Sequence, residues 1–206
     1  MNTIRHLINR LFKSSDTTQE SIMNKSIVIV FHSGYGHTRK IAEAVAEGSR
    51  GQLLAIDAEG NLPEGGWESL AAADAIVFGS PTYMGNVSWQ FKKFADESSK
   101  VWGAQGWKDK LGAAFTNSAS VAGDKQTTLY TMFTLAQQHG MMWVGTGMMP
   151  SNAKAARRDD VNYLSSFAGL ATATPSDASA DEMVRGDLQT AILFGQRVRD
   201  SVARVA

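Results

Sequence analysis

The hydrophobic pattern changes character near residue 25. In the first 22 residues, apolar side chains recur at the spacing of an amphipathic helix, at Ile4, Leu7, Ile8, Leu11 and Phe12. The other face is basic and carries no acidic residue, and the polar linker SSDTTQES follows. We therefore expect an N-terminal extension, residues 1–24, in which a short helix packs on the domain or marks an upstream start. A membrane-surface helix over residues 1–14 is the alternative.

From Lys25 onward, short apolar runs alternate with amphipathic stretches. The apolar runs predict buried strands over residues 26–31, 52–57, 74–79, 111–116 and 141–145. Helical spacing predicts helices over residues 37–48, 87–98 and 127–138. A last helix is expected to begin at the capping box that Ser179 forms with Glu182. Residues 147–178 are rich in Gly, Pro, Ser and Ala and show no clear period.

Alternating strands and helices indicate a parallel sheet covered by helices on both faces. Five strands, with glycines in the loop after the first, fit an α/β flavodoxin-like three-layer sandwich with the strand order 2-1-3-4-5. We expect one such domain, residues 25–206. In these sheets, ligands bind beyond the carboxyl ends of the strands, beside the first strand. The loops after the first, third and fourth strands are therefore the places where a site is expected.

Charge and cysteine content narrow the function classes. The chain has 206 residues, of which 20 are Lys or Arg and 20 are Asp or Glu. This neutrality argues against a nucleic-acid-binding protein and against a strongly acidic electron carrier. The absence of cysteine excludes disulfides, iron–sulfur clusters and thiolate zinc sites, so redox chemistry requires a bound cofactor. No apolar run reaches the roughly 18 residues of a transmembrane helix, and no side-chain cluster has metal-ligand spacing.

The loop after the first strand is suited to an anion. It reads SGYGHT, from Ser33 to Thr38, and opens a helix. Backbone N–H groups and hydroxyls at a helix N-terminus bind phosphate, and Gly34 and Gly36 let the backbone curl around it. The loop matches neither GxxxxGK[ST] nor GxGxxG, so a terminal monophosphate is expected. His37 would oppose the helix dipole unless an anion meets it. An ordinary strand–helix turn is the alternative.

The loop after the third strand is a candidate for contact with a planar ring. It reads GSPTYMGN, residues 79–86. Pro81 is expected to end the strand, and Gly85 with Asn86 to permit a tight turn. Tyr83 and Met84 offer flat or polarizable surface beside the hydroxyl of the preceding threonine.

Three further features have two interpretations each. The loop TNSASVAGDK, residues 116–125, suits either the polar chain and ring edge of a cofactor or a solvated turn. Trp102 and Trp107 are either a stacking wall or core residues. His139 lies at the end of a predicted helix, where it is either catalytic or a cation that satisfies the helix dipole.

With these three loops, the chain resembles the flavodoxin-like NAD(P)H:quinone oxidoreductases of the tryptophan-repressor-binding-protein (WrbA) type. The resemblance runs from about Lys25 to the last helix and rests on SGYGHT at 33–38, GSPTYMGN at 79–86 and HGMMWVG at 139–145. It implies an FMN enzyme in which NAD(P)H and then a quinone use one site. It also implies a homo-oligomer, a dimer or tetramer, and we expect a cytoplasmic protein. A flavodoxin-type FMN electron carrier without its own NAD(P)H or quinone site is the alternative.

The resemblance also implies roles for individual residues. The FMN phosphate would be held by Ser33, Gly34, Tyr35, Gly36, His37 and Thr38. The flavin ring would lie along Pro81, Thr82, Tyr83, Met84 and Gly85, and the ribityl chain and ring along Asn117, Ser118, Ala119 and Ser120. The catalytic residues would be Trp102 in the stacking pocket and His139 near the flavin edge, with Gln137 as the alternative for the histidine position. The chain departs from the family at Tyr83-Met84, where an arginine and a phenylalanine are usual, and in its third loop, which is usually rich in threonine and glycine.

Overall fold

The computed structural model describes residues 25–205. The predicted N-terminal extension, residues 1–24, and its membrane-contact alternative therefore lie outside the described residues. Within the described part, no helix is both long and apolar enough to span a bilayer.

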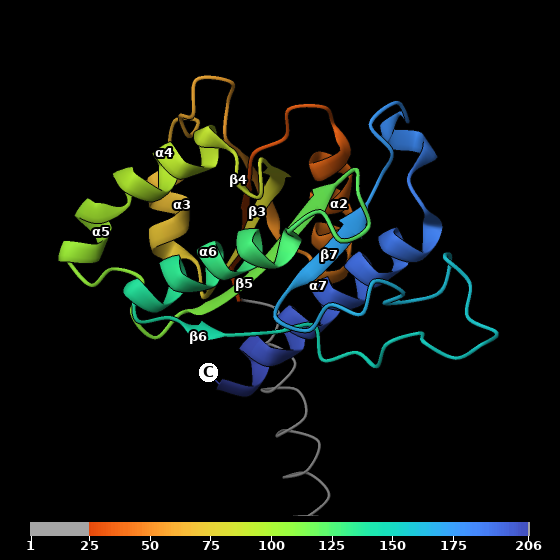
Figure 1. The fold of residues 1–206 in the computed structure, drawn as a ribbon. Helices are drawn as coiled ribbons and strands as arrows, with labels where there is room; N and C mark the ends of the chain where they lie inside the picture. The colour runs from red at the N-terminus through yellow and green to blue at the C-terminus, as the bar shows by residue number, and fades with distance from the viewer. Residues whose placement is uncertain (1–24, 206) are drawn as a thin grey trace, which may run out of the picture.

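One parallel sheet forms the centre of the molecule (Figure 1). Its order is β2 (Gln52–Ala55), β1 (Ile27–Phe31), β3 (Ala75–Tyr83), β5 (Leu111–Ser118) and then β6 (Met142–Trp143). A further strand, β7 (Leu170–Ala173), also pairs with β5, and the short β4 (Asn86–Val87) forms an antiparallel hairpin with β3. This arrangement confirms the flavodoxin-like order 2-1-3-4-5.

The fifth position of the sheet is divided between two short strands. β6 pairs with the start of β5 at Leu111 and Gly112, whereas β7 pairs with its end, from Phe115 to Ser118. Residues 144–169 leave the sheet between them, and we call this segment the insertion. The predicted strand over residues 141–145 is therefore too long, and β7 lies in the stretch for which no period was found. Its sequence LATA is too short to show an alternation, and pairing with β5 defines it.

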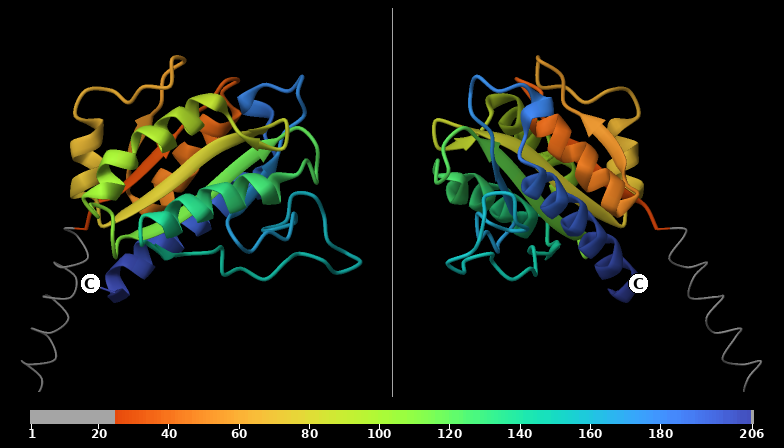
Figure 2. Two further views of the ribbon diagram at one scale, coloured as in Figure 1. Left: turned by 60° about the vertical axis from the view of Figure 1, so that its left-hand side comes forward. Right: turned by 90° about the vertical axis from the view of Figure 1, so that its right-hand side faces the viewer.

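Helices cover both faces of the sheet, as Figure 2 shows edge-on. One face carries α2 (His37–Ser49) and α7 (Arg185–Val205), and the other carries α3 (Gly66–Ala72), α4 (Trp89–Glu97) and α6 (Lys125–Gln138). Side chains of β1 alternate between two separate cores: Ile29 packs toward α2 and α7, and Val30 packs toward α4 and α6. Alternation within a strand that is buried on both sides produces the three layers.

The structure corrects the predicted end of the third strand. Pro81 lies inside β3, which continues to Tyr83. Pairing of β3 with β1 ends at Gly79, whereas pairing with β5 reaches Pro81. In a parallel strand, the backbone N–H and C=O groups of every second residue point to the same neighbouring strand. Those of Gly79 and Pro81 therefore both point toward β1. At Pro81 that neighbour, β1, has already ended, so the missing N–H breaks no ladder bond.

The predicted helix boundaries also need correction. The helix expected over residues 87–98 is α4, which starts after the N-cap Ser88, whose Oγ accepts from the N–H of Phe91 at 3.3 Å. The capping box of Ser179 and Glu182 closes only a 3-10 turn, Ala180–Glu182, and α7 begins at Arg185. The short α3 and α5 (Ser99–Gly103) were not predicted.

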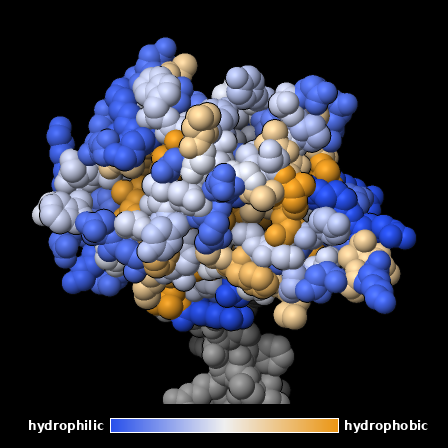
Figure 3. Space-filling view, viewed as in Figure 1, coloured by the Kyte–Doolittle hydropathy of each residue, from blue (hydrophilic) through white to orange (hydrophobic). Residues whose placement is uncertain are grey.

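The face of the molecule that α6 crosses has no continuous apolar patch. Figure 3 shows small, separate apolar groups between polar residues on this side. Exposed aromatic side chains of the described residues include Tyr130 of α6 and Phe167 of the insertion. Scattered apolar residues of this kind are ordinary on a protein surface.

Candidate functional site

A cavity of about 330 Å³ opens at the carboxyl ends of β1, β3 and β5, where the strand order predicts a ligand. All three predicted loops contribute to it. Its lining residues are Tyr35, His37, Thr38, Pro81, Thr82, Tyr83, Asn117, Ser118, Ala119, Thr174 and Ser176. Thr174 and Ser176 were missed, because they follow β7 and that strand was not predicted. The only available signal was a pair of hydroxyl residues after a short apolar run.

A wider groove lies over α4 and is not suited to the same role. It measures about 740 Å³ and is lined by β4, α4 and Thr131. Its charged side chains are already paired along the helix, for example Lys92 with Asp96 at 2.5 Å. The groove takes no residue from the loops after β1 and β5, so we place the functional site in the cavity.

The first loop forms a backbone cradle at the start of α2. The Oγ atom of Ser33 accepts from the N–H groups of Gly36 at 3.2 Å and Arg39 at 3.1 Å, which closes the loop. Gly36 has a φ of 91°, a left-handed conformation that favours glycine. Within residues 25–205, no protein acceptor meets the N–H groups of Tyr35, His37 or Thr38. These donors at a helix N-terminus are free to bind an anion.

Close packing explains the first glycine of this cradle. A Cβ atom added to Gly34 would lie 2.6 Å from the hydroxyl oxygen of Tyr83. The second loop therefore approaches the first so closely that a side chain at position 34 would fill the space between them. The ring of Tyr35 stands edge-on to that of Tyr83, with centroids 6.2 Å apart. Burial, with a smaller effect of Tyr35, raises the pKa of Tyr83, and the two rings form an aromatic rim.

His37 connects the cradle to the segment after β7. Its Nε2 atom lies 2.8 Å from the carbonyl oxygen of Ala178. Because a carbonyl only accepts, Nε2 carries the hydrogen and donates it. The side chain is buried and lines the cavity. It therefore fixes one wall of the site to the start of α2.

The second loop is a two-residue hairpin between β3 and β4. Met84 has a φ of 47° and Gly85 a φ of 76°, and two positive φ angles are typical of a type I′ turn. The turn is therefore Met84-Gly85, whereas Gly85 and Asn86 were expected to form it. The Met84 side chain is fully exposed, and neither turn residue lines the cavity.

Thr82 is held by the protein's own hydroxyl groups. Its Oγ1 atom lies 2.8 Å from that of Thr116 in β5 and 2.8 Å from that of Thr128 in α6. All three side chains are buried. This network joins β3, β5 and α6 beneath the cavity and makes its floor rigid.

A buried lysine holds the third loop. Lys125, the first residue of α6, is 3% exposed, and its Nζ atom donates to the carbonyl oxygens of Ser120 and Val121. Desolvation by burial lowers the pKa of Lys125 to about 8. No role was predicted for Lys125 from the sequence. Its signal was a cation at a helix start, where the dipole disfavours positive charge. Ser120, expected at the cofactor, contributes its carbonyl to this contact and does not line the cavity.

The structure does not bring His139 and Trp102 to the cavity. His139 is buried at the far end of α6, with Nε2 2.9 Å from Oγ of Ser98 and its ring 4.2 Å from that of Trp107. Fourteen residues of α6 separate it from Lys125, a length of about 21 Å. Trp102, in α5, is half exposed near the same end. The catalytic role of both residues stays a prediction, and burial lowers the pKa of His139.

Comparison with known proteins places this architecture in a family. Residues 66–155 match the family model described as NADPH-dependent FMN reductase. Flavodoxin FldP of Pseudomonas aeruginosa (strain UCBPP-PA14) is 51% identical over 176 residues, covering 85% of this chain and 95% of that protein. An NAD(P)H dehydrogenase (quinone) of Solidesulfovibrio magneticus is 30% identical over 204 residues, covering 87% and 98%.

A solved structure agrees with these relatives. The flavodoxin, WrbA-like protein from Agrobacterium tumefaciens is 48% identical and superposes with a TM-score of 0.73, covering 89% of this chain and 100% of that one. A flavodoxin from the domain Archaea, 20% identical with a TM-score of 0.57, supports the fold alone. The sequence resemblance is therefore confirmed: the chain belongs to the flavodoxin-like family of the WrbA type.

Proposed function

We propose that this protein is an FMN-dependent oxidoreductase that takes electrons from NAD(P)H and passes two of them to a quinone. The observation that carries the proposal is the cavity that the three loops build beside the first strand, with a lysine-free anion cradle at one end. The match to NADPH-dependent FMN reductase and the relatives named NAD(P)H dehydrogenase (quinone) support it.

The residues present fit FMN. The free N–H groups at Tyr35, His37 and Thr38 offer neutral donors to a terminal phosphate. Gly36 takes the positive φ that the turn of the cradle requires, and a Cβ atom at Gly34 would meet the hydroxyl of Tyr83. Asn117 and Thr174 supply polar groups along the cavity, while the two tyrosines supply a flat aromatic rim. The cavity thus has a phosphate end, a polar middle and an aromatic edge.

When bound, FMN supplies the redox chemistry, which takes a hydride from NAD(P)H and returns two electrons to the acceptor. The overall reaction converts NAD(P)H, one proton and a quinone into NAD(P)⁺ and a quinol. The protein's part is to bind and orient. The cradle fixes the phosphate, the Thr82 network keeps the floor in place, and the rim of Tyr35 and Tyr83 leaves one exposed edge for substrates.

A second function is favoured by one specific observation. The relative that is 51% identical is named a flavodoxin, which supports an electron carrier without its own NAD(P)H and quinone site. Neutral net charge argues against that function, because carriers that dock on basic partners are usually strongly acidic.

An anaerobic titration separates the two functions. The protein is reconstituted with FMN, and NADH or NADPH is added while the absorbance of the oxidised flavin is followed. We expect rapid bleaching by one of the two donors and recovery on addition of a quinone. Tight FMN binding without bleaching by either donor would overturn the enzyme and leave the carrier. Failure to bind FMN would overturn both.

Two further expectations from the family resemblance belong to this proposal. A homo-oligomer, dimer or tetramer, is tested by sedimentation of the FMN-loaded protein, and a monomer alone would contradict it. A cytoplasmic location is tested by fractionation of cells that express the full chain.

A further inference from the structure

Asn117 is a cavity residue of β5 whose side chain is fixed by residues of the segment that pairs with it, β7 and the residue after it. It is 4% exposed, and its Oδ1 atom accepts from the hydroxyl of Thr172 at 2.8 Å and from that of Thr174 at 3.0 Å. Thr172 also lies 3.3 Å from the carbonyl oxygen of Thr116. The hydroxyl group of Thr172 donates to Oδ1 of Asn117, which is the nearer of these two acceptors. Both threonines are buried, so the amide has a defined orientation.

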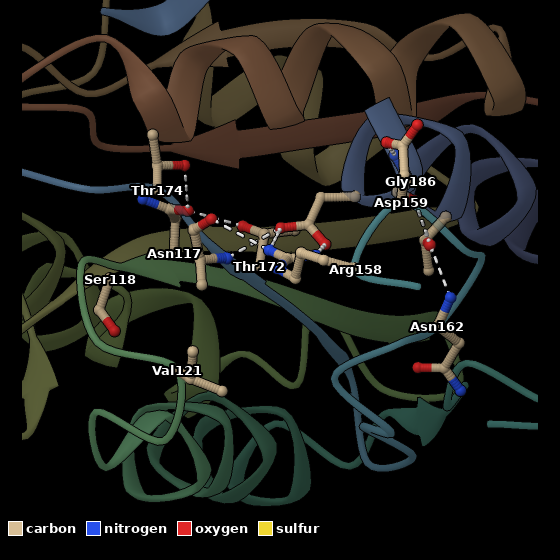
Figure 4. A network of polar contacts seen from close by, with 12 residues as sticks. Asn117, Ser118, Val121, Arg158, Asp159, Asn162, Thr172, Thr174 and Gly186 are labelled. Atoms are coloured by element: carbon tan, nitrogen blue, oxygen red, sulfur yellow. Dashed lines mark hydrogen bonds and ion pairs between the residues drawn. The ribbon is translucent and has the colours of Figure 1, made fainter. Parts of the chain in front are cut away.

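This orientation leaves the amide nitrogen for the cavity. Asn117 lines the cavity, and Figure 4 shows its nitrogen pointing away from the two threonine hydroxyls. Among residues 25–205, no protein acceptor lies within hydrogen-bonding distance of Nδ2. The nitrogen is not enclosed by protein atoms, so a molecule bound in the cavity can accept from its two N–H groups. The side chain thus presents donors, and no acceptor, to whatever binds in the cavity.

An ion pair holds the strand that orients the amide. Ala173, between the two threonines, donates its N–H to Oδ2 of Asp187 at 2.9 Å, and its carbonyl accepts from Nη2 of Arg158 at 3.1 Å. Arg158 and Asp187 bind each other through two bonds, of 2.7 and 2.6 Å. Figure 4 shows this network beside Asn117. Both backbone groups of Ala173 are therefore clamped by one bidentate pair.

The arginine comes from the insertion, which is itself tied to α7. Oδ1 of Asp159 accepts from the N–H of Gly186 at 2.8 Å, and the N–H of Asn162 donates to Oγ1 of Thr190 at 2.9 Å. The insertion, the start of α7 and β7 thus form one connected unit. Among the described residues, the side chains that bond the Asn117 amide are those of Thr172 and Thr174.

The family resemblance already implies that Asn117 lies along the flavin; we propose that Thr172 and Thr174, held by the Arg158–Asp187 pair, are positioning residues that orient its amide as a donor. The amide donates from Nδ2 to an acceptor oxygen of the flavin, in its ring, ribityl chain or phosphate. The proposal rests on the proposed function, since it needs a flavin in the cavity. It goes further by assigning the polarity of this contact and by giving the insertion a task at the site.

Riboflavin binding to the apoprotein tests the donor. Riboflavin lacks the phosphate, so repulsion between a phosphate and the carboxylate of the Asn117→Asp variant does not affect the measurement. Quenching of riboflavin fluorescence gives the dissociation constant. Asn117→Asp keeps an acceptor for both threonines but replaces the donor with a carboxylate oxygen at neutral pH. Asn117→Ala removes the donor only. We expect a loss of about threefold to tenfold for Asn117→Ala and a larger loss for Asn117→Asp.

The positioning residues are tested by a matched pair of double variants. Thr172→Val with Thr174→Val removes both hydroxyls at nearly constant volume, whereas Thr172→Ser with Thr174→Ser keeps them. We expect the valine variant to lose about threefold or more in riboflavin affinity and the serine variant to recover it. Circular dichroism of each variant checks the fold, so that weak binding by an unfolded chain is recognised.

The outcomes distinguish this inference from the proposed function. If the unsubstituted protein binds neither FMN nor riboflavin, the proposed function fails. If both Asn117 variants bind FMN and riboflavin as tightly as the unsubstituted protein, the donor is overturned while the proposed function stands. If FMN affinity alone falls in Asn117→Ala, the acceptor is a phosphate oxygen, which supports the proposal. Equal binding by the valine and serine variants would overturn the positioning role.

Discussion

Lys125 occupies the first position of α6, where a cation opposes the positive end of the helix dipole. The side chain is buried, and its ammonium donates to two carbonyl groups of the loop that lines the cavity. Sequence reasoning found the polar residues of this loop but not the lysine beneath it, because a lysine in a polar stretch is usually solvated. Asn117 was found as a loop residue, but its partners belong to a strand that has no visible sequence pattern. Local sequence thus indicated which residues lie near the cavity, and tertiary contacts decide what each one does there.

We predict that flavin affinity depends on pH through Lys125. Its pKa is lowered to about 8 by burial, so the ammonium loses its proton as the pH rises through that value. Its charge-assisted bonds to the loop then weaken, and the FMN affinity of the protein should fall about threefold to tenfold between about pH 7 and about pH 9. Fluorescence quenching of FMN at each pH measures this.

Two variants control the measurement. Lys125→Met has no proton to lose and should bind FMN weakly with a flat profile, whereas Lys125→Arg stays charged throughout and should bind well with a flat profile. Since burial disfavours the charged lysine, Lys125→Met is not expected to lower the free energy of unfolding at neutral pH. A profile for Lys125→Arg that follows the unsubstituted protein would contradict the assignment.

The left-handed glycine of the cradle gives a second prediction at this scale. Gly36→Ala forces an alanine into a φ of 91°, which should lower the free energy of unfolding by about 1–2 kcal/mol. It should also weaken FMN binding more than riboflavin binding, because the cradle meets the phosphate. Gly103→Ala is the matched control. Gly103 lies in α5, a Cβ atom there would meet nothing within 4 Å, and its stability should stay equal or rise slightly. Equal losses of both flavins in Gly36→Ala would remove the cradle from phosphate binding.

At the scale of elements, the hydrophobic pattern predicted the helices and strands that bury an apolar face of their own. It missed the strand segments that form only because a neighbouring strand pairs with them. α2 shows a clear helical period and β1 is a continuous apolar run. Each of their predicted boundaries lies within one residue of the observed one. β7 and the extension of β3 past Pro81 exist because β5 is long enough to pair with them. α6 is apolar on several sides and still lies in one layer. Its first residue, Lys125, holds the loop that lines the cavity, whereas His139 follows its last residue.

The contact between the end of α6 and the aromatic core predicts an acid-sensitive stability. Burial lowers the pKa of His139 below its ordinary value of 6.5. The unfolded chain therefore binds the proton more readily, and the contribution of this residue to stability is complete above pH 6.5 and declines as the pH falls below it. We expect the free energy of unfolding in urea to be smaller at about pH 5.5 than at about pH 7.5.

His139→Gln isolates this effect. Glutamine keeps a polar group for Ser98, which lies 2.9 Å from the imidazole, but has no proton to gain. The loss of stability on acidification should therefore be smaller in the variant. Some loss should remain, because burial also lowers the pKa of His32. If acidification costs the variant as much stability as it costs the unsubstituted protein, His139 is not the group that titrates.

At the scale of the whole molecule, the insertion reaches the cavity through an ion pair that sequence could not reveal. Arg158 and Asp187 are 29 positions apart, and both lie in stretches where charged residues are common. Their bidentate contact and the clamp on Ala173 follow only from the way the chain returns to the sheet edge as β7. The flavodoxin-like order, in contrast, follows from the alternation of strands and helices, because few topologies satisfy that pattern. The frame was predictable, while the connection between the insertion and the site was not.

That connection makes a prediction about stability and binding together. Asp187 is 3% exposed, and Arg158→Met leaves its carboxylate buried without its partner. Removing one partner of a fully buried pair costs about 3–5 kcal/mol. Because the Arg158 side chain is 30% exposed, the cost here should be smaller, but it should still exceed the cost of removing both charges. Arg158→Met combined with Asp187→Asn should therefore unfold at a higher urea concentration than Arg158→Met alone.

The same double variant tests binding. The asparagine still accepts from the N–H of Ala173, but no cation holds the carbonyl oxygen of Ala173. Riboflavin affinity in the double variant should therefore fall toward that of the Thr172→Val, Thr174→Val protein. A double variant that is as unstable as the single one would show that the charge on Asp187 is not what the arginine neutralises. A double variant that is stable and binds riboflavin as tightly as the unsubstituted protein would show that the insertion does not position Asn117.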